Sequence, residues 1–511
     1  MPNSPTPEGL SPPDKYRVTP MRWFVLFYFS LLSCNQCLAW FSFSSLSMPL
    51  LQEYFGAALD KATIDLLLNW GPIIGVVFFP VQTWLLQQKH GLQRGIWLGL
   101  HLQLAGCVIR CVPILITEAS GWKPGSPDAT FAQSSAAFAM YHIGQILIAA
   151  AGPLVMGTVT RLAVVWFPED ERTTATAIAQ TANGLGTTVG FLNPQWLATS
   201  SASVPNIFWF SLVLAVVSEA CACFYLPPTP PSPPSAAAAA TFGTAATAPS
   251  PDPSTAAARA VDAVLSSNHA LPLLEPAGST SSTIGVGGGS EAAGGGLRNY
   301  VATVCVAFSS RSYMLLVLVA SLLSGVLIGW QGLLQSILGP TSLSPSAVSW
   351  VGFANGLAIN VGAILAARVM DTWLQRRLKL GLLVGLGGCL LSTAWFTLQL
   401  PCSLYPTERM LVPRSEVSLV VAITLAGLCQ GAITPLFYEL AAELVYPVRE
   451  GMSAGILVML LNTAAGVLIF CNNALPESDM NLIATITIAV TILVLAFAVK
   501  EEYRRPQDVK G

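Results

Sequence analysis

Residues 163–172 read AVVWFPEDER, and residues 442–451 read AELVYPVREG. Each stretch ends a long apolar run with an aromatic residue and a proline, and charged residues follow directly. The two prolines are 279 positions apart, since 447 minus 168 is 279. Asn183 and Asn462, in the apolar runs that come next, are separated by the same 279 positions. A spacing shared by two markers predicts two related halves with the same order of helices.

The composition predicts a membrane protein. Of the 511 residues, 53% are hydrophobic and only 10% are charged, whereas soluble domains carry about 25% charged residues. A spanning helix needs about 20 mostly apolar residues. Segments that meet this length lie near 22–50, 63–88, 94–117, 134–166, 172–199, 206–226, 312–337, 346–370, 379–400, 417–445, 452–473 and 480–499.

The predicted fold class is therefore an all-α integral membrane protein with about twelve transmembrane helices in two six-helix pseudo-repeats. The stretch between the halves begins with six prolines within eight residues and continues rich in Ala, Ser and Gly, a composition typical of disorder. The expected organisation is a cytosolic N-terminal tail at 1–20, an N-terminal half at 21–226, a disordered cytosolic linker at 227–300, a C-terminal half at 301–499 and a cytosolic C-terminal tail at 500–511.

Lysine and arginine residues predict the orientation. With the N-terminus in the cytosol, the inner side receives 18 of these residues, the outer side 4 and the helices 2, which together make the 24 in the chain. The positive-inside rule then places both termini and the linker in the cytosol.

Several function classes lack support. The net charge of −2 gives no sign of a nucleic-acid partner. The sequence also lacks a phosphate-binding loop with its lysine, so it does not support an ATP-driven pump. Cys34 and Cys37 form a C-x-x-C pair, but no second pair or His pair completes a metal site. We expect no catalytic site, no metal and no cofactor, and the chain is not predicted to be an enzyme.

Several motifs resemble one transporter family. They are Trp84-Leu85-Leu86 with His90-Gly91-Leu92, Trp166-Phe167-Pro168, the stretch 183–191 (NGLGTTVGF), the stretch 435–440 (PLFYEL) and 443–447 (ELVYP) with Glu450-Gly451. Together they resemble the major facilitator superfamily, and within it solute carrier family 49, the heme-, choline- and pyridoxine-transporter-like family. The resemblance covers both halves and excludes the tails and the linker. Residues 110–113 (RCVP), 350–353 (WVGF) and 391–398 look most like the lysosomal branch implicated in proton-coupled pyridoxine export.

Polar residues inside a membrane are costly and are therefore functional candidates. In the first helix, Gln36 and Trp40 are four positions apart and share a face. An indole beside an amide suits a flat or cationic solute through stacking or cation–π contact. The alternative is that both residues only pack helix against helix.

Two further amides are implied by the resemblance. Gln145 falls where the family presents an amide to its substrate, and Asn462 corresponds to it in the other half. One amide from each half would hold a hydroxyl group or ring nitrogen between them. Asn183, the repeat partner of Asn462, is expected to be structural.

Three titratable side chains are candidates for carrying a coupled proton. His142 lies one turn before Gln145, His101 lies in the third helix and Glu219 in the sixth. Histidine titrates near lysosomal pH, which would suit proton coupling. The alternatives are a simply hydrogen-bonded histidine and a glutamate that reaches toward the inner interface.

Charged residues near the cytosolic ends predict a gate. The loop between the second and third helices holds Gln88 where the superfamily usually has an acid, whereas the second half keeps Asp371 with Arg376 and Arg377. The resemblance therefore implies a latch carried mainly by the second half.

Arg161 lies seven residues before Pro168, and Glu439 lies eight before Pro447. Their matched depth suggests an ion pair that forms when the cytosolic side closes. The alternative is that Glu439 and Glu443 anchor the arginines of the neighbouring loop.

The expected function is secondary active or facilitative transport of a small vitamin- or amine-like solute such as pyridoxine, with proton coupling as an open possibility. Choline or heme transport, and a transporter-fold receptor or scaffold without flux, are the alternatives. The expected partners are the solute, the lipid bilayer and protons, and the chain is expected to be a monomer. The expected site is a lysosomal or other internal membrane, with the plasma membrane as the alternative.

Overall fold

The computed structural model describes residues 18–88, 90–168, 171–234, 310–338, 343–372, 377–400, 415–445, 450–471, 476 and 479–501. These residues fold almost entirely into helices. The first half contains α1 (Met21–Trp40), a short α2 (Met48–Phe55), α3 (Lys61–Gln87), α4 (Gly91–Ala119), α5 (Ser135–Trp166), α6 (Arg172–Leu197) and α7 (Pro205–Phe224). The second half contains α11 (Arg311–Gly332), a short α12 (Leu334–Leu338), α13 (Pro345–Thr372), α14 (Leu378–Leu398), α15 (Glu416–Val445), α16 (Glu450–Cys471) and α17 (Met480–Phe497).

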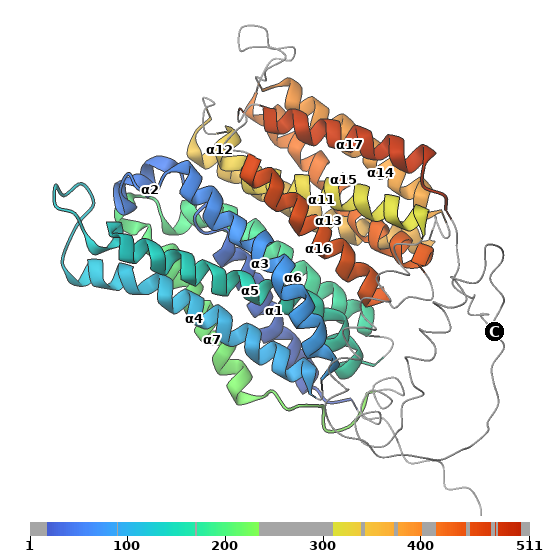
Figure 1. Ribbon diagram of the computed structural model, residues 1–511, viewed down its shortest axis with the longest axis horizontal. Coiled ribbons are helices and arrows are strands. Elements are labelled where there is room, and N and C mark those ends of the chain that lie inside the picture. The colour runs from blue at the N-terminus through green and yellow to red at the C-terminus, as the bar shows by residue number, and fades with distance from the viewer. Residues whose placement is uncertain are drawn as a thin grey trace, which may run out of the picture.

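The two halves form two helix bundles that lie side by side (Figure 1), the first coloured blue to green and the second yellow to red. Each bundle has six long helices within the described residues. The predicted fold class is confirmed. Most of the predicted linker at 227–300 and both chain ends lie outside the described residues, so the domain boundaries stay a prediction.

Ten of the described helices are long and apolar enough to cross a membrane. Their outer faces carry large apolar side chains, such as Leu391 at 75% and Phe497 at 86% exposure, which lipid rather than water would cover. α6 is not among these ten helices, because threonine, asparagine and glutamine interrupt its apolar sequence.

The first segment of each half is broken, which corrects the expectation of continuous helices at 22–50 and 312–337. α1 ends at Trp40, and residues 41–47 form turns before α2 begins. The hydroxyl groups of Ser42 and Ser45 donate to the backbone oxygens of Ala39 and Ser42, a local bonding pattern that competes with helix continuation. The second half repeats the break at Leu333, between α11 and α12.

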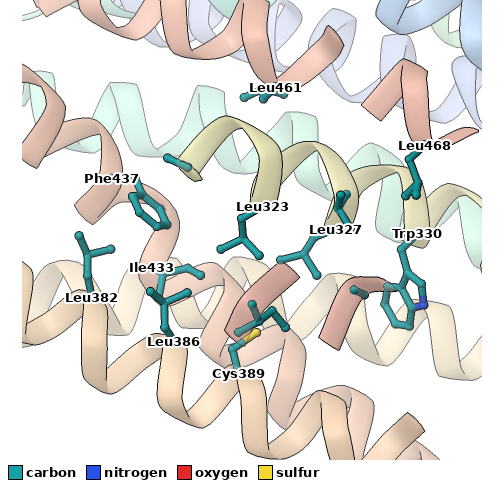
Figure 2. Packing of buried hydrophobic residues seen from close by; sticks show 14 of the residues in the cluster. Leu323, Leu327, Trp330, Leu382, Leu386, Cys389, Ile433, Phe437, Leu461 and Leu468 are labelled. Carbon is teal, nitrogen blue, oxygen red and sulfur yellow. The ribbon is translucent and has the colours of Figure 1, made fainter. Parts of the chain in front are cut away.

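Branched and aromatic side chains fill the core of the second bundle (Figure 2). Leu323 and Leu327 of α11 are buried among Leu386 of α14 and Ile433 and Phe437 of α15. Burial of each such side chain is worth about 1.5–3 kcal/mol against water. In a bilayer much of that term vanishes, because lipid tails are equally apolar, and close packing stabilises the bundle instead.

Candidate functional site

The two halves meet along two helix pairs, α3 with α16 and α6 with α13. On α3, Gly75 faces the amide of Asn462 on α16, and a Cβ atom at position 75 would lie 3.4 Å from Asn462 Oδ1. On α6, Gly184 faces the amide of Asn360 on α13 in a similar way. Each pair thus places an amide of the second half against a glycine of the first.

Trp40, at the end of α1, also contacts α3. Its indole lies against Gly71, and its Nε1–H donates to the backbone oxygen of Leu68 at 2.9 Å. Pro72 stands four residues after Leu68 inside α3. Proline has no N–H, so the Leu68 oxygen lacks its usual partner within the helix. Trp40 supplies the missing donor.

Trp40 is partly buried where the two bundles meet. Its ring packs edge-on against Phe41 and against a hydrophobic cluster that spans both halves and includes Phe41 and Leu68 of the first. Gly71 and Gly75 are one helical turn apart. Trp40 and Asn462, two of the predicted substrate-binding residues, therefore contact neighbouring positions of α3.

Gln145 is fully buried behind this position, with 0% of its surface exposed. Its Nε2 donates to the backbone oxygen of Trp40 at 2.9 Å, and its Oε1 accepts from Nη1 of Arg110 at 2.7 Å. Both ends of the amide are engaged by the protein. In this conformation Gln145 supports the end of α1.

Gln36 also bonds to the protein backbone. It is 6% exposed, lies against Gly152 of α5 and donates to the oxygen of Ile148 at 3.3 Å. Asn462 differs from both glutamines, because it is only partly buried and its Nδ2 donates within its own helix, to the oxygen of Val458 at 2.8 Å. The role of all four residues in substrate binding stays a prediction.

The predicted gate residues are only partly placed. Arg161 is partly buried and forms no ion pair with the residues that the structure describes. Glu439 is exposed and Glu443 is buried, and both have partners within the protein. Arg377 is exposed. Arg376 and the side chain of Asp371 lie outside the described part of the chain, so the latch and the gate stay predictions.

His142 accepts a hydrogen bond at Nδ1 from the indole Nε1–H of Trp70, at 3.0 Å. A nitrogen that accepts a hydrogen bond carries no proton, so neutral His142 has its proton on Nε2. Protonation of Nδ1 to form the cation would break the bond from Trp70. His142 is therefore held between α3 and α5 by an aromatic partner rather than by an acid.

Glu219 forms the other titratable contact, across α4 and α7. Its Oε1 lies 2.7 Å from Nδ1 of His101, and His101 stacks on Trp97 at an interplanar angle of 28°. The Glu219 side chain is 14% exposed and that of His101 is 61% exposed. Two of the three sequence candidates for proton coupling thus form one pair.

A cavity of about 360 Å³ opens near the ends of helices from both halves. Its lining comes from the α1–α2 connection, α2, α6 and α13, and includes Ser47, Gln195, Thr199 and Ser349. None of the lining residues that the structure describes is charged. The described residues contain no group of three or more His, Cys, Asp or Glu side chains that would hold a metal ion.

Sequence reasoning missed several polar residues at the helix breaks. Gln331, at the end of α11, donates to Oδ1 of Asn355 at 3.2 Å, and Asn355 donates to the oxygen of Ile423 at 3.1 Å. Trp330 donates to Asn481 at 2.7 Å. The cost of polar side chains inside a membrane would have marked all of them, but the sequence did not show which helices they join.

Sequence comparison finds relatives among solute carriers. The chain is 28% identical over 457 residues to "Solute carrier family 49 member 4 homolog" from Xenopus laevis, covering 89% of this chain and 86% of that protein. It is 25% identical over 454 residues to "Solute carrier family 49 member A3" from Danio rerio, covering 87% and 76%. Over a shorter stretch, 36% of this chain and 29% of the relative, it is 30% identical to "Choline/ethanolamine transporter FLVCR1" from Mus musculus.

Solved transporters share the fold. A D-xylose–proton symporter superimposes with a TM-score of 0.60 at 14% identity, covering 94% of this chain and 98% of that one. The inward-open xylose transporter XylE of E. coli gives 0.59 at 13% identity, covering 94% and 96%. The family model of the Major Facilitator Superfamily matches residues 32–467. Two six-helix bundles, the long family match and the solute-carrier relatives lead to one conclusion: this chain is a member of the Major Facilitator Superfamily.

Proposed function

We propose that the chain is a secondary active or facilitative transporter of a small organic solute, working by alternating access between its two halves. One observation carries the proposal. Trp40 of the first half and Asn462 of the second contact α3 one turn apart, at Gly71 and Gly75. A solute held by an indole and an amide from opposite halves would couple its binding to their relative position.

We propose a vitamin- or amine-like solute, with pyridoxine as the first candidate. An indole face attracts a flat ring or a cation, and the amides supply hydrogen bonds to a hydroxyl group or ring nitrogen. The sequence resemblance to the pyridoxine-exporting branch supports this choice. Choline is the second candidate, favoured by the partial similarity to a choline/ethanolamine transporter, and heme is the third.

We further propose a monomer in a lysosomal or other internal membrane, with both termini in the cytosol. An acidic lumen would supply protons, and His142 and the Glu219–His101 pair are the candidate carriers. The competing proposal is a receptor or scaffold with a transporter fold and no flux. The plasma membrane is the alternative site.

The test is transport in cells that express the full chain. Labelled pyridoxine, choline and heme are offered separately, with and without a pH gradient, and uptake and efflux are both measured. We expect saturable flux of one solute and a higher apparent KM in Trp40→Phe and Asn462→Ala. Trp350→Phe is a matched control, since Trp350 packs on Phe353 within α13. No flux of any of the three solutes, from a chain present at its membrane, would contradict the proposal and favour the receptor.

A further inference from the structure

Arg110 on α4 is a charged side chain buried within the first bundle, with 1% of its surface exposed. Its Nη1 donates to three acceptors: the backbone oxygen of Ala39 at 2.9 Å, Oγ of Ser42 at 3.0 Å and Oε1 of Gln145 at 2.7 Å. Two of these acceptors belong to the last turn of α1 and the break that follows it. Arg110 therefore reaches from α4 to the point where the first helix stops.

No carboxylate balances this charge among the residues that the structure describes. The end of α1 takes that role. Backbone oxygens in the last turn of a helix lack intrahelical donors, and the helix dipole makes this end negative. The guanidinium also lies over the rings of Phe208 and Phe43, 5.2 and 5.8 Å from their centres, and aromatic faces favour a cation.

The bonds continue from Arg110 to the proposed solute site. Gln145 takes one bond from Arg110 and donates in turn to the Trp40 backbone oxygen. Trp40 then donates from its ring to Leu68 on α3. A continuous path thus runs from α4 through α5 and α1 to α3, and Trp40 is held at both its backbone and its ring.

We propose that Arg110 is a positioning residue of the transport site, which holds the broken end of α1 and, through Gln145, sets the orientation of Trp40. Only the predicted effect of Arg110 on transport kinetics rests on the proposed function; its effect on the position of Trp40 does not. Arg110 does not touch the solute. Its effect is on the geometry of the indole.

The decisive measurement needs no solute. The chain is labelled with 5-fluorotryptophan, and the fluorine-19 resonance that disappears in Trp40→Phe identifies Trp40 among the 13 tryptophans. Arg110→Met is expected to shift or broaden this resonance, whereas Arg110→Lys retains it, because one ammonium group can donate to all three acceptors. Gln103→Met is the matched control. Gln103 lies on α4, is fully buried and donates to the Asn35 oxygen of α1, but it does not reach the break.

Transport kinetics give the second readout. Once a solute is known, Arg110→Met is expected to raise the apparent KM about tenfold, the loss that a charge-assisted hydrogen bond typically causes, with little change in maximal rate. Arg110→Lys restores most of the affinity. If no solute is found, the proposed function fails while the resonance still tests the positioning.

Should Arg110→Met not yield folded protein, Gln145→Met interrupts the same path at its next step and is expected to move the same resonance. The proposal is overturned if the Trp40 resonance keeps its wild-type position in these variants. It is equally overturned if Gln103→Met moves it as far as Arg110→Met does.

Discussion

Trp40 and Asn462 belong to opposite halves of the chain, yet both contact α3, at glycines separated by one helical turn. α3 thus forms a common wall for the two side chains. Pro72 of α3 adds a second feature, because the backbone oxygen of Leu68, which Pro72 leaves without a helical donor, is the acceptor for the Trp40 indole.

Trp40→Phe is expected to destabilise the protein as well as weaken solute binding. The substitution keeps a ring but removes the indole N–H, so the Leu68 oxygen has no donor from Trp40 and none from Pro72. An unsatisfied buried oxygen lowers the free energy of unfolding by about 1–3 kcal/mol. In Trp40→Phe/Pro72→Ala, residue 72 regains its N–H and the thermal stability in detergent should recover, while the apparent affinity should not. A double variant no more stable than Trp40→Phe would contradict this account.

Asn462→Ala and Gln145→Ala are expected to act differently. Loss of Asn462, a partly buried amide at the interface, should raise the apparent KM and leave surface expression intact. Loss of Gln145 should also lower stability by about 1–3 kcal/mol, because Arg110 and the Trp40 oxygen each lose a partner. Transport kinetics and thermal unfolding of both variants test the distinction. Unchanged kinetics in the double variant would remove both residues from the site.

The proposed cytosolic gate is tested by charge reversal. Arg161→Glu and Glu439→Arg should each impair transport, because each single reversal sets two like charges against each other, and the double reversal should restore part of it, because it makes the charges opposite again. The structure shows Arg161 without an ion pair among the described residues, so the pair itself stays a prediction. Surface labelling controls for delivery to the membrane. A double variant as inactive as the worse single one rejects the gate.

Glu219→Gln is expected to uncouple transport from the pH gradient. The change removes the titratable carboxyl group but keeps a hydrogen-bond acceptor for His101. Exchange of labelled for unlabelled solute without a gradient should persist, whereas stimulation by an acidic lumen should disappear. His142→Gln is the comparison, since Trp70 rather than an acid contacts His142. Wild-type stimulation in Glu219→Gln would exclude this pair from coupling.

Deletion of residues 232–295 is expected to leave folding and transport largely unchanged. The composition of this stretch predicts too little apolar surface to form a core, and the entropy cost of joining two halves changes only slowly with the length of the connection. Size-exclusion chromatography in detergent and the transport assay measure the result. Loss of a monodisperse protein after the deletion would show that the segment has a structural role.

The sequence predicted the long helices well, because length and hydropathy mark most segments that can cross a membrane. It did not predict the breaks after Trp40 and Gly332. The run 41–51 holds no charged residue, and the local bonds that its serines make are visible only in the fold. The sequence pointed to Trp40 and Asn462 as candidate site residues. Their shared contact with α3 depends on how the helices pack, which the spacing of apolar residues does not specify. Likewise His101 and Glu219 were both recognised as titratable, but only the fold pairs them.

α6 has a consequence for the biosynthesis of the chain. A helix too polar to qualify as a span on its own gives the insertion machinery a weak signal. In the finished protein Asn183 of α6 donates to the Ser33 oxygen of α1 at 3.2 Å, so this amide gains its partner when α6 packs against α1, which precedes it in the chain. Substitutions along this contact should therefore reveal themselves first as immature, rapidly degraded chains, before any change in transport could be measured.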